Sequence, residues 1–254
     1  KLTQVLGAMM ILLIGYVAFS TNPPVGSAVK ETFVPSSINL MAIITLIGGT
    51  VGGYIMFSGG HRLIDAGIVG EENLSQVNKS AILGMSVATI VRVFLFLAVL
   101  GVVSLGNQLD AGNPAADAFK IAAGTVGYKI FGLVFLAAAL TSIVGAAYTS
   151  VSFLKTLFKV VKDNENFFII GFIVVSTLIL IFLGKPVKLL VLAGSLNGLI
   201  LPITLAITLI ASKKEGIVGK YKHSNILFYL GWVVVLVTAY IGVQSLSKLA
   251  ELFA

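Results

Sequence analysis

The 254-residue sequence has no cysteine, only two histidines and few charged residues. The absence of cysteine excludes disulfides, thiolate metal sites and thiol catalysis, and two histidines leave little for a zinc or haem site. Charged residues make up 11% of the chain, hydrophobic residues make up 57%, and the mean hydropathy is +1.05. A soluble protein of this length needs about twice that charged fraction to cover its surface. The composition therefore indicates an integral membrane protein.

Acidic residues are also missing from the central turns of seven long apolar stretches. These stretches are residues 3–20, 38–57, 81–105, 127–152, 167–183, 186–210 and 226–243. A segment of about 20 apolar residues matches the roughly 30 Å hydrocarbon core of a bilayer. Because the runs are continuous rather than alternating, they predict helices and not the strands of a barrel. We expect an all-α polytopic membrane helix bundle of about seven transmembrane helices, in a single transmembrane domain over residues 1–254.

The basic residues predict the orientation of this bundle. They are scattered among the connections, so the net charge of +7 is a topology signal rather than a nucleic-acid site. With seven spans, the face that holds the N-terminus carries ten basic residues and the other face carries six. Basic residues favour the cytoplasm, which predicts a multi-pass protein of the cell (inner) membrane with the N-terminus of this chain inside and its C-terminus outside. A span starts directly after Lys1, a residue other than methionine, so we expect the chain to be part of a longer protein.

Four glycines lie within six residues of the second apolar stretch, in the segment 48–54 (GGTVGGY). Each costs about 1 kcal/mol in a helix interior relative to alanine, so this is the weakest helical point of the chain. The glycines either let a neighbouring helix pack closely or mark a break at mid-membrane whose backbone groups bind a substrate. We favour the break, because two adjacent registers of glycine pairs are present where packing needs one. The predicted substrate-binding residues here are Gly49, Thr50, Val51, Gly52, Gly53 and Tyr54, with the backbone carbonyls of Val51 and Gly52 as candidate metal ligands.

Arg92 lies near the middle of the third apolar stretch. A charged residue at the bilayer centre costs about 2.5–3.5 kcal/mol even on a lenient scale. Either the span is shifted so that Arg92 lies nearer an interface, or its side chain faces the bundle interior. No span of this chain offers an acid to pair with it, so an interior Arg92 would meet an acid from elsewhere, helix carbonyls or an anionic substrate. We predict a role in gating or in a proton pathway.

Two further polar residues are candidates for function. Asn197 lies mid-span between two glycines, and a buried amide needs partners, so we predict that it binds substrate. His61 follows the second stretch, beside Arg62 and Asp65. It belongs either to a solvated loop cluster or to a gate or proton relay, since histidine titrates near neutral pH. No nucleophile elbow, phosphate-binding glycine loop or HExxH motif occurs, so we expect neither an enzyme nor a cofactor.

Three segments together resemble the natural-resistance-associated macrophage protein (Nramp) family of divalent-metal transporters. They are residues 47–54 (IGGTVGGY), 131–142 (FGLVFLAAALTS) and 199–205 (LILPITL). In order and spacing they are similar to that family's broken sixth helix, small-residue eighth helix and Leu-Pro tenth helix. The resemblance covers nearly the whole chain, as spans five to eleven. The segment 57–65 (FSGGHRLID) looks most like a divergent bacterial branch.

The resemblance implies a LeuT-like fold of two inverted five-helix repeats. This chain would hold the last helix of the first repeat, the second inverted repeat over residues 38–210 and an extra helix at 226–243. It also implies an Asp and Asn ligand set in a first repeat that lies outside this chain. Where the family has Met-Pro-His in its sixth helix, this sequence has Gly52, Gly53 and Tyr54, and so lacks the soft methionine sulfur that favours transition metals.

These observations predict a secondary-active membrane transporter, of divalent metal cations with proton coupling, that works by alternating access around a broken helix at 49–54. One alternative is the same fold carrying a small organic anion or an amino-acid derivative, which would use Arg92 and the positive end of a half-helix. Another is a non-transporting membrane scaffold in which the glycines only pack helices. The expected partners are the lipid bilayer, a divalent cation or small solute, and the missing N-terminal half of the transporter, with no nucleic acid.

Overall fold

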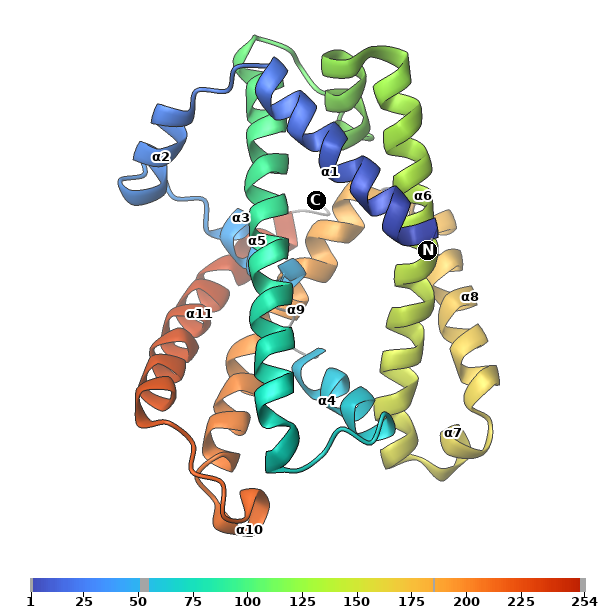
Figure 1. Ribbon diagram of the computed structural model, residues 1–254, viewed down its shortest axis with the longest axis vertical. Helices are drawn as coiled ribbons and strands as arrows, with labels where there is room; N and C mark the ends of the chain where they lie inside the picture. The colour runs from blue at the N-terminus through green and yellow to red at the C-terminus, as the bar shows by residue number, and fades with distance from the viewer. Residues whose placement is uncertain (1, 51–54, 185, 252–254) are drawn as a thin grey trace. The chain divides into compact units, whose positions relative to one another are not determined.

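The computed structural model describes residues 2–50, 55–184 and 186–251 of the chain, and every regular element in these ranges is a helix (Figure 1). The helices are α1 (Leu2–Ser20), α2 (Val25–Phe33), α3 (Leu40–Thr50), α4 (Ile55–Asp65), η1 (Glu71–Asn73), α5 (Leu74–Ser104), α6 (Pro114–Leu157), α7 (Lys159–Asp163), α8 (Glu165–Leu183), α9 (Pro186–Ala211), α10 (Glu215–Val218) and α11 (Asn225–Glu251).

Five of the described helices are long and apolar enough to cross a membrane. They are the continuous segment Glu71–Ser104, α6, α8, α9 and the Asn225–Gln244 part of α11. The helices α1 and α2 are bent by 101° and add a sixth span if the pair is counted as one. The all-α polytopic membrane fold is therefore confirmed.

The second predicted span, residues 38–57, corresponds to two helices rather than to one described helix. It comprises α3 and the beginning of α4, and α3 has only 11 residues. A helix of that length spans about 16 Å, roughly half of the hydrocarbon core. Residues 51–54, between the two helices, lie outside the described part of the chain. The break predicted there stays a prediction.

Several helices extend further than their apolar stretches predict. The helix α5 begins at Leu74 rather than at 81, and α11 continues past 243. Hydropathy detects the apolar part of a helix, whereas residues such as Gln76 and Lys79 are good helix formers that continue it into a polar environment. In α6, Gly124 has non-helical dihedrals (φ 62°, ψ −161°), and the helix after it corresponds closely to the predicted span 127–152.

The described chain divides into two compact units. One unit combines Lys1–Ser37 with Glu72–Gly145. Its core is formed where α1 packs on α5 and is completed by α6, with Phe119 and Phe131 stacked at 4.7 Å between ring centroids. At Gly101 of α5 an added Cβ would collide with the Thr21 hydroxyl, so this glycine allows the end of α1 to approach α5 closely.

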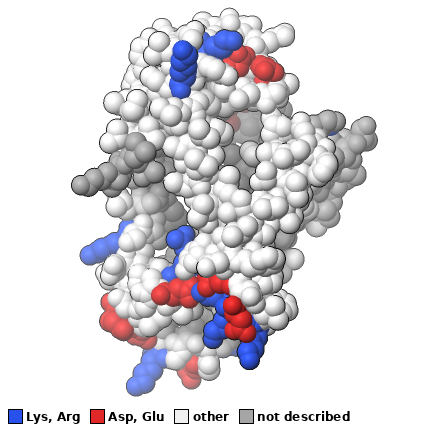
Figure 2. Space-filling model, turned by 90° about the vertical axis from the view of Figure 1, so that its right-hand side faces the viewer, with Lys and Arg blue, Asp and Glu red and all other residues white. Residues whose placement is uncertain are grey.

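The other unit combines Ile38–Glu71 with Ala146–Ala254. In it α3, α9 and α11 pack on one another, and α9 and α11 run side by side in Figure 1. The helix α8 contributes no buried residue although it is the most apolar of the predicted spans. An exposed apolar helix of this kind needs an apolar environment, which the bilayer supplies. Figure 2 shows a surface that is largely uncharged, with the Lys, Arg, Asp and Glu residues in groups.

Candidate functional site

Glycines make a close contact between the backbones of two helices in the second unit. Gly48 of α3 is buried, and an added Cβ there would collide with the Gly194 carbonyl and the Gly198 amide of α9. In the opposite direction, a Cβ on Gly194 would lie 2.8 Å from the Thr45 carbonyl oxygen, and one on Gly198 would lie 2.6 Å from that of Ile44. The two backbones touch, and no side chain larger than hydrogen fits between them. For Gly48, the packing interpretation of the glycine segment is therefore correct.

The next glycine has a different environment. Gly49 is exposed, and an added Cβ would meet nothing within 4 Å. Thr50 is half-buried, and its hydroxyl donates to the Ile47 carbonyl at 3.2 Å, within its own helix. Val51, Gly52, Gly53 and Tyr54, the other predicted binding residues of this segment, lie outside the described residues. Packing therefore accounts for Gly48 and leaves Gly49 available for another role.

Asn197 of α9 bonds directly to the end of α3. Its side-chain Nδ2 donates to the Gly48 carbonyl oxygen at 2.8 Å. The carbonyls in the last turn of a helix need donors from elsewhere, and α3 ends, as described, two residues after Gly48. The sequence predicted that this amide needs a partner. The partner is the backbone immediately before the predicted binding segment.

A second polar link between α3 and α9 was not predicted from the sequence. The hydroxyls of Thr45 and Ser195 lie 2.8 Å apart, and the Ser195 hydroxyl also lies 3.4 Å from the Met41 sulfur. Ser195 is almost fully buried, where an unpaired hydroxyl is costly. The signal that could have indicated this link is spacing, because Thr45 precedes Gly48 by three residues and so lies on the same face of the helix.

Two rings of α6 face the charged end of α4. The His61 ring lies 5.4 Å from the Phe153 ring, and the Arg62 guanidinium carbon lies 5.5 Å from the centre of the Tyr148 ring. His61 is half-buried and Arg62 is exposed. His61 therefore belongs to an interface between two helices.

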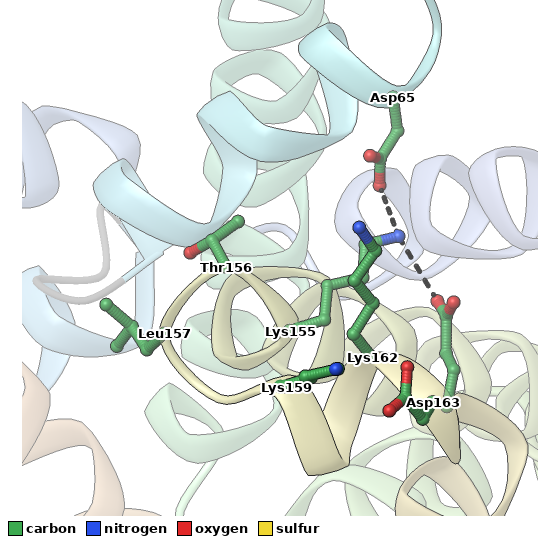
Figure 3. Close-up of a pocket in the computed structure, with 8 residues that line it drawn as sticks. Asp65, Lys155, Thr156, Leu157, Lys159, Lys162 and Asp163 are labelled. Carbon is green, nitrogen blue, oxygen red and sulfur yellow. Dashed lines mark hydrogen bonds and ion pairs between the residues drawn. The ribbon is translucent and has the colours of Figure 1, made fainter.

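One turn further along α4, Asp65 enters a network of three helices (Figure 3). The Ser152 hydroxyl of α6 donates to Asp65 Oδ2 at 2.7 Å, and Lys155 Nζ lies 3.1 Å from the same oxygen. Lys155 Nζ also lies 3.4 Å from Glu165 Oε1 at the start of α8. Figure 3 shows the Lys155 ammonium beside the Asp65 carboxylate, with a dashed line to it and another to a second carboxylate. These side chains line a hollow of about 810 Å³. From the sequence, Asp65 is only a neighbour of His61, and its partners on α6 were not predicted, because a separation of more than 80 residues carries no local signal.

The charge state of Asp65 follows from these contacts. The hydrogen bond from Ser152 and then that from Lys155 hold the pKa of Asp65 below its ordinary value. Because the folded-state pKa is lowered, the stabilisation by these contacts is complete above the ordinary carboxyl pKa. It is lost only as the pH falls through the lowered value. Asp65 is therefore ionised at neutral pH and does not exchange a proton in that range.

Arg92 lies on the exposed surface of α5, with 12 helical residues after it. Within the described part of the chain it has no ion pair or hydrogen bond. No group of three or more His, Cys, Asp and Glu among the described residues could hold a metal ion.

Known proteins similar to this chain were found by sequence. A sequence model described as natural resistance-associated macrophage protein-like matches residues 1–248. An uncharacterized membrane protein of Bacillus subtilis, YcsG, is 56% identical over the whole chain, which covers 63% of its length. An uncharacterized membrane protein of Haemophilus influenzae is 49% identical, and the chain covers 64% of it. The chain therefore spans less than two thirds of these relatives. No solved structure matches it.

Proposed function

Because this chain belongs to the natural resistance-associated macrophage protein-like family, we propose that the full-length protein is a secondary-active, proton-coupled transporter of divalent metal cations. It works by alternating access in the inner membrane, with the N-terminus of this chain in the cytoplasm. Residues 38–210 are the second of two inverted repeats, and residues 226–243 are an extra helix. The protein moves its substrate without changing it chemically and is not an enzyme.

The observation that carries this proposal is the bond from Asn197 to the Gly48 carbonyl. It links α9 to the last turn of α3, directly before residues 49–54. In transporters with discontinuous helices, the ends of half-helices supply backbone carbonyls to a cation near the midplane. We propose the backbone carbonyls of Val51 and Gly52 as ligands of the cation, and Gly49, Thr50, Gly53 and Tyr54 as the other substrate-binding residues of this segment.

The seven apolar stretches of this sequence contain no Asp or Glu that could bind the cation within the membrane. A divalent cation in a low-dielectric site needs anionic ligands to offset its lost hydration. The carboxylates of the described network, Asp65 and Glu165, are already paired with Lys155. The acids at the cation site would come from the N-terminal part of the full-length transporter.

His61 is the residue that we assign to the proton pathway. It is half-buried against Phe153, at the end of the helix that follows the proposed site. Asp65, one turn away on α4, is ionised at neutral pH. Arg92, on α5, would act in gating.

Uptake by the purified full-length protein in proteoliposomes tests the cargo. We expect Mn²⁺ or Fe²⁺ uptake that is faster with an inward proton gradient and is lost when a protonophore collapses it. Empty liposomes are the control. Absence of protein-dependent flux for Mn²⁺, Fe²⁺ and Mg²⁺ would refute the metal-transport proposal.

A second candidate cargo, a small organic anion or amino-acid derivative, is favoured by Arg92. Its exposed guanidinium has no acid partner within the described residues, and a guanidinium binds carboxylates in a bidentate manner. For such a cargo, Arg92→Gln would reduce uptake of an organic acid by about 10- to 100-fold through loss of a charge-assisted hydrogen bond, and Arg92→Lys would retain part of it. Organic-acid uptake that is unchanged in Arg92→Gln would contradict this candidate.

A further inference from the structure

The two helices on either side of residues 51–54 are attached to their neighbours in different ways. The helix α3 lies with its backbone against α9, where Gly48, Gly194 and Gly198 leave no space for a Cβ. The hydrogen bonds of Asn197 and Thr45 add to this contact. By comparison, α4 approaches the α9 backbone at few positions.

Among the described residues, side chains rather than backbones make the contacts between α4 and α6. They are the ring contact of His61, the cation–π contact of Arg62, and the bonds that Ser152 and Lys155 donate to Asp65. The side chains of Lys155 and Asp65 remain 20% and 30% exposed. Ion pairs of this kind are weak, because water solvates both charges when they separate. The α4 contact can therefore open and close, whereas the glycine contact of α3 cannot slide without a steric clash.

Lys155 has an arrangement suited to such opening. Its ammonium lies between Asp65 of α4 and Glu165 of α8 (Figure 3). When α4 moves away, Lys155 keeps Glu165 as a partner, and the Asp65 carboxylate is solvated in the adjacent hollow of about 810 Å³. Neither charge is left buried and unpaired, which is the condition under which separating an ion pair becomes costly.

We infer that Lys155 is a latch that holds α4 closed on α6, and that α4 moves during transport while α3 and α9 move together as one body. This assignment rests on the proposed alternating-access function. It concerns the motion rather than the cargo. Its test therefore measures the opening of α4 directly and requires no substrate.

Single cysteines report this opening, since the chain contains none of its own. Ser152→Cys places a thiol at a fully buried position in contact with α4, and Ser195→Cys places one in the α3–α9 contact. Both are introduced into the full-length protein after any cysteine outside this chain has been replaced. The rate of alkylation by N-ethylmaleimide is then measured with Lys155 intact, as Lys155→Met and as Lys155→Arg.

Loss of the latch is expected to expose Ser152→Cys selectively. Lys155→Met should raise its alkylation rate about tenfold, the amount expected from losing two partly exposed ion pairs, and Lys155→Arg should restore slow alkylation. The rate at Ser195→Cys should not change in either variant. An unchanged rate at Ser152→Cys, or an equal rise at Ser195→Cys, would overturn the assignment. If the alkylation rates change as expected but no metal is transported, the assignment of Lys155 as a latch is retained and the metal-transport proposal is refuted.

Discussion

Gly48→Ala is expected to destabilise the protein and to abolish transport. The new methyl group would collide with the carbonyl of Gly194 and the amide of Gly198, and neither backbone group can rotate away as a side chain would. Overpacking a filled core costs about 1–3 kcal/mol, and a backbone collision belongs at the upper end of that range. The measurements are the thermal unfolding midpoint of the purified full-length protein and its initial rate of metal uptake.

Gly49→Ala is the matched control for stability. It makes the same chemical change one residue later, where an added Cβ meets nothing within 4 Å. Its unfolding midpoint should therefore stay close to that of the unmodified protein. A Gly48→Ala variant with an equally unchanged midpoint would contradict the close approach of α3 and α9.

The same control separates transport from a scaffold function. Alanine favours a regular helix over glycine by about 1 kcal/mol, so in a transporter with a break at residues 49–54, Gly49→Ala should slow metal uptake without destabilising the fold. In a scaffold whose glycines only pack helices, Gly49→Ala would have no effect on solute binding.

Asn197→Leu is expected to reduce metal uptake by about tenfold or more. Leucine preserves the side-chain volume but removes the donor to the Gly48 carbonyl. A buried acceptor left without its partner costs about 1–3 kcal/mol, and the affected carbonyl lies directly before the proposed cation site. The initial rate of Mn²⁺ uptake in proteoliposomes, normalised to reconstituted protein, is the measurement.

Thr45→Val is the control for Asn197→Leu. It removes a different hydrogen bond between α3 and α9, the one to Ser195, and preserves side-chain shape. It should lower the unfolding midpoint to a similar degree while uptake stays near that of the unmodified protein. If Thr45→Val and Asn197→Leu reduce uptake equally, Asn197 contributes only to packing, and its proposed role beside the cation is wrong.

The apolar stretches predicted the helical membrane fold well and the ends of the helices poorly. Hydropathy measures transfer into hydrocarbon, and a helix can continue into water when its residues favour it. The helices α5 and α11 do so. The short helix α2 was not predicted, because no apolar stretch of membrane-spanning length contains it.

The predicted site residues had different outcomes for a physical reason. Asn197 was identified correctly as an amide that needs a partner, since burial of a polar group can be inferred from one apolar stretch. Which atom it would meet could not be inferred, because Gly48 is 149 residues away along the chain. Long separations along the chain also concealed the links of Ser195 to Thr45 and of Lys155 to Asp65, which join different helices.

By itself, the sequence determined that this protein is a helical membrane protein, because the length and composition of each apolar stretch decide locally whether it enters the bilayer. Its motifs indicated the family. The tertiary structure alone decided that Gly48 packs while Gly49 does not, and that Asp65 is paired and ionised. Those properties depend on which backbone or charge lies across a helix contact, and contacts between distant segments leave no periodic pattern in the chain.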